Sequence, residues 1–181
     1  MKEEIKIRLA TRSDVDFISQ TVMQSIEDSN ESVFDCLRNL CILDDTLYSY
    51  CHALIAEVSG SVVGCIVAYP GEIYKESRDI TFDFILQKTG LSLTPNAIET
   101  GPGEFYIDSL YVDTEYRGLR IGEKLIKEAI RYREQNIATL IVDNSSPGLQ
   151  KYYSECGFRP ISGVIENFGR TYTKMIYDEK D

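Results

Sequence analysis

Residues 104–133 read EFYIDSLYVDTEYRGLRIGEKLIKEAIRYR, and this stretch decides the fold. Its first part, Glu104–Val112, is mostly aromatic and aliphatic and predicts a strand. Its last part predicts a helix over 121–133, because apolar residues recur at helical spacing. The residues of this apolar face are Ile121, Leu125, Ile126, Ala129 and Ile130.

The turn between this strand and this helix reads Arg117-Gly118-Leu119-Arg120-Ile121-Gly122. The first N–H groups of a helix have no intrahelical acceptor and the helix dipole adds positive potential there, so such a turn can bind an anion. Arg117 and Arg120 add charge and could pair with phosphate oxygens. Taken alone, the pattern fits a plain strand–helix turn with exposed arginines equally well.

Downstream of this stretch, strand and helix alternate. An apolar run predicts a short central strand over 138–142. Ser146 followed by Pro147 is typical of a helix start, and Gly157 is expected to end that helix after Cys156. Alternation over 171–177 predicts a last strand.

Upstream, alternation over Ile5–Leu9 predicts a strand that leads into two amphipathic helices. The first helix is expected to begin with Ser13 as N-cap and Asp16 at the capping-box position, and the second to span 31–43. Together with the downstream elements, this order predicts a mixed α/β sheet.

The clearest hairpin pairs Ala53–Val58 with 61–69 around the turn Ser59-Gly60. Residues 71–103 follow and are irregular, apart from an expected helix over 80–88. A segment of this length inside a domain is often functional.

A length of 181 residues corresponds to one domain, expected to span 1–181 with a variable insertion at 71–103. The net charge of −10 and the lack of a basic run argue against a nucleic-acid partner. The acidic surplus could attract cationic small molecules, but solubility alone explains it as well and is the interpretation we favour. No apolar run is long enough for a membrane span and no signal peptide is seen, so a cytoplasmic location without membrane association is expected.

The single histidine, His52, excludes zinc sites built from several histidines, and any Ser–His or Cys–His pair would have to use it. The five cysteines form no C-x-x-C pair and are read as reduced thiols. We therefore expect no metal.

Three motifs, in this order, resemble the GNAT superfamily of acetyl-CoA-dependent N-acetyltransferases. They are Leu110-x-Val112, the 117–122 turn, and Tyr153-Ser154-Glu155-Cys156-Gly157-Phe158. The family's phosphate turn reads Q/R-x-x-G-x-G/A, and its tyrosine stands four residues before Gly-Phe. The resemblance covers nearly the whole chain except 71–103. It implies one GNAT-like α/β domain, with helices flanking a mixed, mostly antiparallel sheet that contains a splayed central strand pair.

The resemblance also implies roles for single residues. Pantetheine would lie along the backbone of Leu110, Tyr111 and Val112, and Tyr153 would act as general acid toward the leaving thiolate. The pyrophosphate would sit on the turn formed by Arg117, Gly118, Leu119, Arg120, Ile121 and Gly122.

Two positions depart from the family pattern. Arg120 replaces the first glycine of the phosphate turn, where glycine lets the backbone approach the phosphates closely. Arginine at this position keeps a backbone N–H and adds a cation. Ser146 stands where many members have asparagine, and it can still cap a helix.

The general base is left open between two carboxylates. Glu104 begins the central strand, where part of the family has a base, and is our first candidate. Asp108 lies four residues further, on the same face if the strand is regular, and is our second. An acid at the start of a strand is equally often just solvated.

We therefore expect an N-acetyltransferase that moves acetyl from acetyl-CoA to a primary amine, of a small molecule or a protein, by direct attack in a ternary complex. Two alternatives stay open: a catalytically silent coenzyme A-binding regulatory or interaction module, and another α/β protein that binds phosphates or nucleotides. The sequence does not identify the acceptor, and a homodimer stays open.

Overall fold

An eight-stranded sheet forms the centre of the computed structural model, which describes residues 4–135 and 137–178. The strand order is β1-β2-β3-β4-β5-β8-β6, with β7 beside β8, and only the β4–β5 pair is parallel among the described strands. The strands are β1 (Ile5–Leu9), β2 (Ala53–Val58), β3 (Ser61–Pro70), β4 (Glu104–Val112), β5 (Ile137–Asp143), β6 (Arg159–Pro160), β7 (Ile165–Asn167) and β8 (Arg170–Asp178). The predicted α/β class, with a mixed and mostly antiparallel sheet, is confirmed. The ends of the expected 1–181 domain lie outside the described residues.

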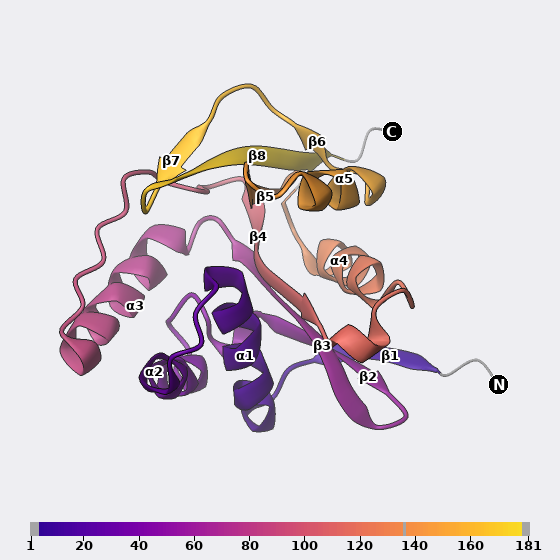
Figure 1. The fold of residues 1–181 in the computed structure, drawn as a ribbon, viewed down its shortest axis with the longest axis horizontal. Coiled ribbons are helices and arrows are strands. Elements are labelled where there is room, and N and C mark those ends of the chain that lie inside the picture. The colour runs from indigo at the N-terminus through magenta and orange to yellow at the C-terminus, as the bar shows by residue number, and fades with distance from the viewer. Residues whose placement is uncertain (1–3, 136, 179–181) are drawn as a thin grey trace.

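Helices cover both faces of the sheet (Figure 1). The α-helices are α1 (Val15–Ile26), α2 (Glu31–Ile42), α3 (Tyr74–Thr89), α4 (Ile121–Tyr132) and α5 (Pro147–Glu155). Short 3-10 turns lie at Arg12–Asp14, Tyr50–His52 and Thr114–Tyr116. Figure 1 places α1, α2 and α3 on one side of the central strands and α4 and α5 on the other.

Two hydrophobic cores result, one on each face of the sheet. On β2, Leu54, Ala56 and Val58 pack into the core beneath α4, whereas Ala53 and Ile55 pack into the core beneath α1. Both sets are buried because helices cover both faces, which explains why every residue of β2 except Glu57 is apolar.

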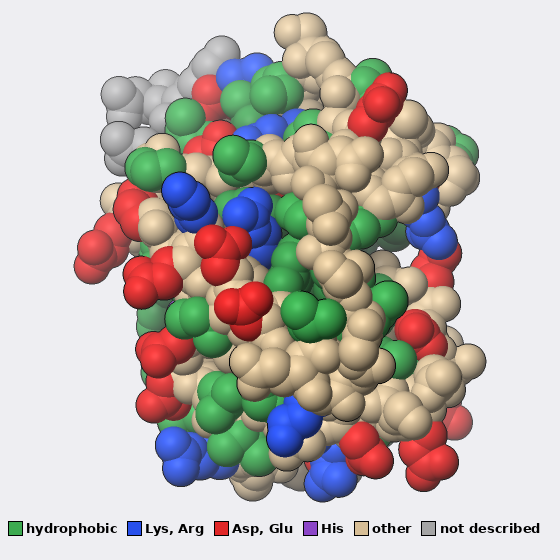
Figure 2. Space-filling view, turned by 90° about the vertical axis from the view of Figure 1, so that its left-hand side faces the viewer, with side chains coloured by type: hydrophobic (Ala, Val, Ile, Leu, Met, Phe, Trp, Pro, Cys, Tyr) green, Lys and Arg blue, Asp and Glu red, His purple; other side chains and the backbone are tan. Residues whose placement is uncertain are grey.

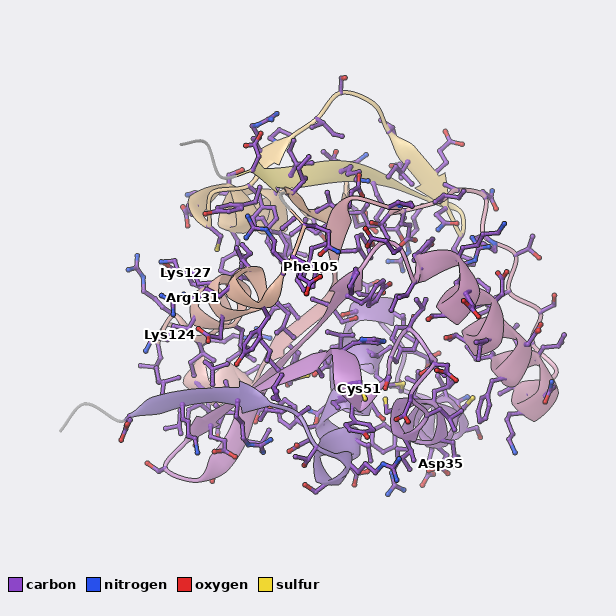
Figure 3. All side chains as sticks on the ribbon, turned by 180° about the vertical axis from the view of Figure 1, so that it is seen from behind. Asp35, Cys51, Phe105, Lys124, Lys127 and Arg131 are labelled. Carbon is purple, nitrogen blue, oxygen red and sulfur yellow. The ribbon has the colours of Figure 1, made fainter. Side chains whose placement is uncertain are left out.

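Helix α4 is strongly amphipathic, as its sequence predicts. Leu125, Ile126 and the other apolar residues of its inner face are buried against the sheet. Figure 3 shows Lys124, Lys127 and Arg131 projecting from its outer side.

Strands β4 and β5 pair over only three positions, from Glu104–Ile137 to Tyr106–Thr139. Beyond that point β4 continues beside β3 up to Val112, and β5 continues beside β8 up to Asp143. The two central strands therefore separate, which confirms the predicted splayed pair.

A β-bulge at Asp108 accompanies this separation. Val67 pairs with Ser109 and Ala68 with Ile107, so Asp108 has no residue directly opposite it on β3. Before the bulge Ile107 faces the α4 core, and after it Leu110 does. The extra residue thus shifts the alternation of β4 by one position.

The start of the first helix differs from the prediction. Thr11, not Ser13, is the N-cap of the 3-10 turn Arg12–Asp14 that leads into α1, and its backbone N–H donates to the Asp14 carboxylate at 2.8 Å. Asp14 also accepts two hydrogen bonds from the Arg8 guanidinium at 2.8 Å each, and Arg8 pairs with Glu57 of β2 at 2.7 Å. The capping box therefore begins two residues earlier and ties the helix to the first hairpin. Asp16 instead pairs with Arg38 of α2.

The insertion at 71–103 is more regular than predicted. The expected helix over 80–88 is a longer helix, α3, with polar residues around much of its circumference. The loop after it runs back to β4 and exposes apolar side chains such as Leu91 and Ile98. Figure 2 looks onto the α3 side of the molecule and shows hydrophobic side chains between acidic and basic ones.

Gly71 closes the insertion, because its N–H donates to the Glu104 carbonyl at 2.7 Å. A Cβ at this position would collide with the backbone of Gly101, which cannot move aside cheaply. We expect Gly71→Ala to lower the melting temperature by roughly 5–10 °C, from backbone strain of about 2–3 kcal/mol. Gly101→Ala is the matched control, because a Cβ there meets nothing within 4 Å. Equal melting temperatures for the two variants would contradict this packing.

Candidate functional site

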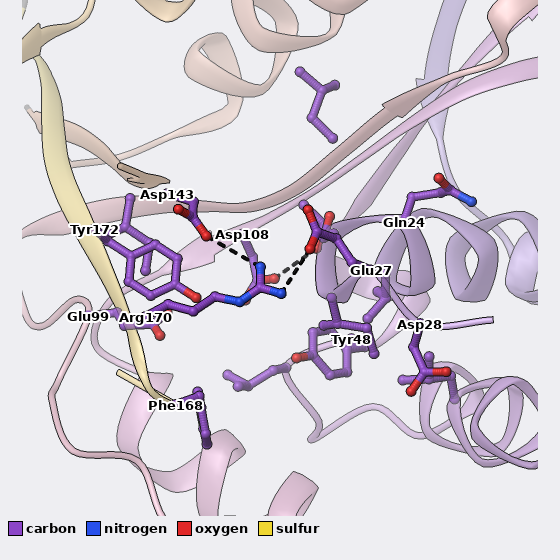
Figure 4. A pocket seen from close by; sticks show the side chains of 18 of the residues that line it. Gln24, Glu27, Asp28, Tyr48, Glu99, Asp108, Asp143, Phe168, Arg170 and Tyr172 are labelled. Atoms are coloured by element: carbon purple, nitrogen blue, oxygen red, sulfur yellow. Dashed lines mark hydrogen bonds and ion pairs between the residues drawn. The ribbon is translucent and has the colours of Figure 1, made fainter. Parts of the chain in front are cut away.

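A cavity of about 690 Å³ lies where β4 and β5 separate. Its walls come from α1, α2, α3 and the loop after α3 on one side, and from β5, α5 and β8 on the other. The β4 residues that line it are Tyr106, Asp108, Ser109, Leu110 and Tyr111. Figure 4 shows part of this lining, with Asp108 near the centre.

Asp108 presents a carboxylate to this cavity from the bulge of β4. It accepts a hydrogen bond from the Tyr69 hydroxyl at 2.6 Å and another from the Ser109 hydroxyl at 2.9 Å. Burial raises the pKa of Asp108 to about 6, the Tyr69 hydrogen bond opposes this shift, and the charge of Glu99 adds to it. A carboxyl group with this pKa can accept a proton near neutral pH.

Glu104 has a different environment and does not line the cavity. Its carboxylate accepts hydrogen bonds from Lys174 at 2.6 Å, from Thr100 at 2.9 Å and from Thr139 at 3.1 Å. Of the two predicted candidates for the base, Asp108 lines the cavity and Glu104 does not.

The 117–122 turn leads from β4 into α4. The Arg117 N–H donates to the Thr114 carbonyl at 3.3 Å, and the next amide with a backbone acceptor in the described part of the chain is that of Lys124, which donates to Arg120 at 3.1 Å. The amides of Gly118 to Glu123 donate to no described residue. Arg117 is exposed and lines the cavity. These amides fit an anionic group such as a pyrophosphate.

Arg120 is the N-cap of α4 and adopts a left-handed conformation, with φ 59° and ψ 27°. This explains why the resembling family has glycine here, because glycine adopts this conformation without strain. Arginine preserves the course of the turn, and its side chain points to Glu123 at 3.3 Å. Gly122 is needed for another reason, since a Cβ there would collide with the Tyr152 hydroxyl.

Tyr153 lines the cavity from α5. Its position is set by the end of that helix, where the Phe158 N–H donates to the Tyr153 carbonyl at 3.0 Å and Gly157 donates to Ser154 at 3.1 Å. Gly157 has φ 98°, as a Schellman motif requires, and the rings of Tyr153 and Phe158 pack at 6.1 Å. Burial raises the pKa of Tyr153 to about 12, so its hydroxyl keeps its proton at neutral pH.

The remaining predicted residues divide between the cavity and the core. Leu110, Tyr111 and Ser146 line the cavity, whereas Val112 packs against the α4 core. His52 packs beside Tyr69, with ring centroids 5.8 Å apart, and does not line the cavity.

Several lining residues escaped the sequence analysis. The most relevant are Glu99 from the loop after α3, Tyr48 after α2, Tyr74 from α3 and Arg170 from β8. Tyr74 and Glu99 lie within the insertion at 71–103, and the length of that insertion was the one sequence feature that pointed to a functional role for it.

Comparisons with known proteins agree with the geometry. A profile of the Acetyltransferase (GNAT) family matches residues 19–158. A solved acetyltransferase is 28% identical with a TM-score of 0.77, over 97% of this chain and 100% of that one. An N-acetyltransferase from Staphylococcus aureus Mu50 is 26% identical with a TM-score of 0.81, over 94% of this chain and 99% of that one.

The NatC complex bound to Gag peptide and CoA has the same fold, at 17% identity and a TM-score of 0.58, over 98% of this chain and 99% of that one. A search of curated proteins gives no match. In the described ranges no helix is long and apolar enough to cross a membrane. The same residues hold no group of three His, Cys, Asp or Glu placed to bind a metal ion.

The fold and the family match define an acyl-CoA N-acyltransferase. The chain belongs to the acetyltransferase (GNAT) family.

The left-handed N-cap of α4 generates a stability prediction. We expect Arg120→Gly to raise the free energy of unfolding by about 0.5–1 kcal/mol, because glycine relieves the strain and the exposed pair with Glu123 contributes little. Chemical denaturation measures this change. Arg120→Ala is the control, since alanine keeps the strain and should give no gain. A gain of the same size in both variants would mean that the side chain, not the backbone, is responsible.

Proposed function

We propose that this enzyme transfers the acetyl group of acetyl-CoA to a primary amine by direct attack in a ternary complex. The observation that carries the proposal is the continuity of the cavity. It extends from Arg117, beside the amides of the 117–122 turn, along the open edge of β4 to Asp108 and Tyr153.

The cosubstrate would be held mainly by backbone groups. The amides of the 117–122 turn suit the pyrophosphate. The backbone of β4 at Leu110, Tyr111 and Val112 suits the pantetheine arm, because β5 no longer pairs with β4 there. The resemblance to the family supports the same placement. When bound, the thioester supplies the acetyl group.

Residues of this chain would handle the two protons of the reaction. An alkyl ammonium has a pKa of about 10.4, so the acceptor arrives charged and must lose a proton to Asp108. The amine nitrogen then forms a bond to the carbonyl carbon while the carbon–sulfur bond breaks. Tyr153 donates its hydroxyl proton to the leaving sulfur, and the acylated nitrogen gives up its second proton, which returns through solvent to the Tyr153 phenolate. Asp108 releases the first proton to solvent, so one proton is set free per turnover. Placing both reactants in one cavity supplies much of the rate enhancement.

One assay tests the proposal as a whole. Acetyl-CoA is incubated with the enzyme and a panel of amines, and release of the coenzyme A thiol is measured alongside the melting temperature. We expect acetyl-CoA to raise the melting temperature and at least one amine to give thiol release. Stabilisation by acetyl-CoA without release by any amine would instead support the silent coenzyme A-binding module. Stabilisation by ATP and not by coenzyme A would support a nucleotide-binding protein.

The raised pKa of Asp108 predicts how the activity depends on pH. The base must be deprotonated to act, so kcat/KM should fall as the pH drops through about 6. Asp108→Asn should lower kcat/KM by roughly 10²–10⁴-fold and abolish this acidic limb.

Glu104→Gln is the matched control for this experiment, and we expect it to retain the acidic limb because Glu104 lies outside the cavity. Its stability should be recorded, since the variant breaks the pair with Lys174. Loss of the limb in Glu104→Gln and its persistence in Asp108→Asn would reverse the assignment.

Tyr153→Phe tests the general acid. The ring and its packing on Phe158 remain, so acetyl-CoA affinity by calorimetry should stay nearly unchanged. Turnover should fall by roughly 10²–10⁴-fold, because the thiolate loses its proton donor. Tyr152→Phe is the neighbouring control and should keep most of the activity, since Tyr152 does not line the cavity. Full activity in Tyr153→Phe would move the acid role to solvent.

A further inference from the structure

Several carboxylates besides Asp108 line the cavity, and one of them is Glu99. Glu99, from the loop after α3, accepts hydrogen bonds from the Tyr106 hydroxyl at 2.8 Å and from the Asn167 side-chain amide at 2.7 Å. Both donors are neutral, so they orient the Glu99 carboxylate without neutralising its charge. In the acetyl transfer proposed above, Glu99 acts only through the effect of its charge on the pKa of Asp108 and is given no contact with a substrate.

Nearby cations are already engaged by other carboxylates. Lys174 donates to Glu104 and reaches only the backbone carbonyl of Glu99, at 3.0 Å. Arg170 bridges Glu27 at 2.8 Å and Asp143 at 3.3 Å, as Figure 4 shows. Two carboxylates share one guanidinium in this ion-pair group, so the group as a whole adds negative charge to the cavity wall.

On the α3 side of the cavity, Arg78 pairs with Asp79 at 2.9 Å. Arg117 lies at the other end of the cavity, on the turn that suits the pyrophosphate. The acceptor side of the cavity therefore carries more negative than positive charge, which a cationic ligand would balance.

Tyrosine rings line the space around the two carboxylates. Tyr48, Tyr74 and Tyr106 all contribute to the cavity wall, and the rings of Tyr74 and Tyr106 lie 6.4 Å apart. The pKa of each tyrosine is raised by burial and by the charges of both Asp108 and Glu99, so both carboxylates act on the same group of rings. Aromatic faces accommodate methylene chains and attract ammonium groups.

Glu99 is held firmly although it lies in a loop. Asn167 of β7 is 1% exposed, and its amide oxygen accepts the Asn96 N–H at 2.9 Å while its amide nitrogen donates to Glu99. One buried side chain thus fixes both the loop and the carboxylate. A preorganised charge loses little entropy when it binds a ligand.

We propose that the acceptor is a small molecule with two ammonium groups on an aliphatic chain, a diamine or polyamine. One ammonium group lies at Asp108 and reacts, and the second binds Glu99 among the tyrosine rings. Glu99 is then a specificity-determining residue. The proposal rests on the acetyl transfer proposed above and identifies the substrate class of that same site.

The test compares acceptors that differ in one charge. Wild-type enzyme is assayed for thiol release with terminal diamines from diaminopropane to diaminohexane, and with aminobutane and aminobutanol. We expect the best diamine to exceed both monoamines in kcat/KM by at least about tenfold, as one charged hydrogen bond provides. Glu99→Gln should remove this preference and leave kcat/KM for the monoamines nearly unchanged above pH 7, where Asp108 is deprotonated with or without the Glu99 charge. The fold at this point should persist, because the glutamine oxygen can accept from Asn167 while its NH2 donates to the Tyr106 hydroxyl.

Glu166→Gln is the matched control, since it removes one negative charge from the exposed surface of β7 and should keep the preference. Turnover of monoamines without a diamine preference would overturn the inference and leave the proposed function intact. An equal loss for all acceptors in Glu99→Gln would assign Glu99 a structural role and overturn it too. So would a higher kcat/KM for the terminal amine of a peptide than for any diamine. Absence of turnover with every amine would overturn the proposed function together with the inference.

Discussion

The separation of β4 from β5 beyond the Tyr106–Thr139 pair is the constraint on which the rest of the structure depends. A strand edge inside a sheet normally has its backbone groups paired, and leaving them open costs free energy unless something else binds them. Here β3 holds β4 up to Val112 and β8 holds β5 up to Asp143, so neither strand can swing back to close the gap. The gap is thus a fixed feature of the fold, and the cavity forms around it.

The bulge at Asp108 determines which side chains of β4 face that gap. Without the extra residue, alternation would keep Ile107 on the α4 face and place Ser109 there next. With it, Leu110 and Val112 return to the α4 core, while the Asp108 carboxylate stays toward the cavity with Tyr69 as donor. Burial then raises the pKa of Asp108, whereas Glu104, four residues earlier, pairs with Lys174. The inserted residue therefore gives two carboxylates of one strand different surroundings.

Where local physics decides the structure, the sequence was sufficient to predict it. The Ser59-Gly60 hairpin and the amphipathic face of α4 follow from turn chemistry and spacing. The tyrosine motif has a similarly local cause, since Gly157 must stand at the left-handed end of α5 and Phe158 must pack on Tyr153.

Where distant contacts decide the structure, the sequence was not sufficient. The bulge depends on the register with β3, which no pattern within β4 reveals. Helix α3 was underestimated because its weak amphipathicity carries little periodic signal. Strands β6 and β7 were missed because Arg159–Pro160 and Ile165–Asn167 are too short to alternate and exist only by pairing with β8. Glu99 acquires its position from Asn167, sixty-eight residues away.

The charged residues show the same difference between what composition reveals and what only the fold brings together. The net charge of −10 by itself says little about the cavity, because exposed charges separated by more than about 8 Å are screened at physiological ionic strength. The carboxylates of the cavity come from the end of α1, the loop after α3, β4 and the end of β5, which meet only in the folded chain. At the other end of the cavity, Arg117 and the free amides of the α4 turn provide the opposite sign. On the proposed function, an anionic cosubstrate and a cationic acceptor would each be drawn to one end, and their reacting groups would meet where β4 and β5 separate.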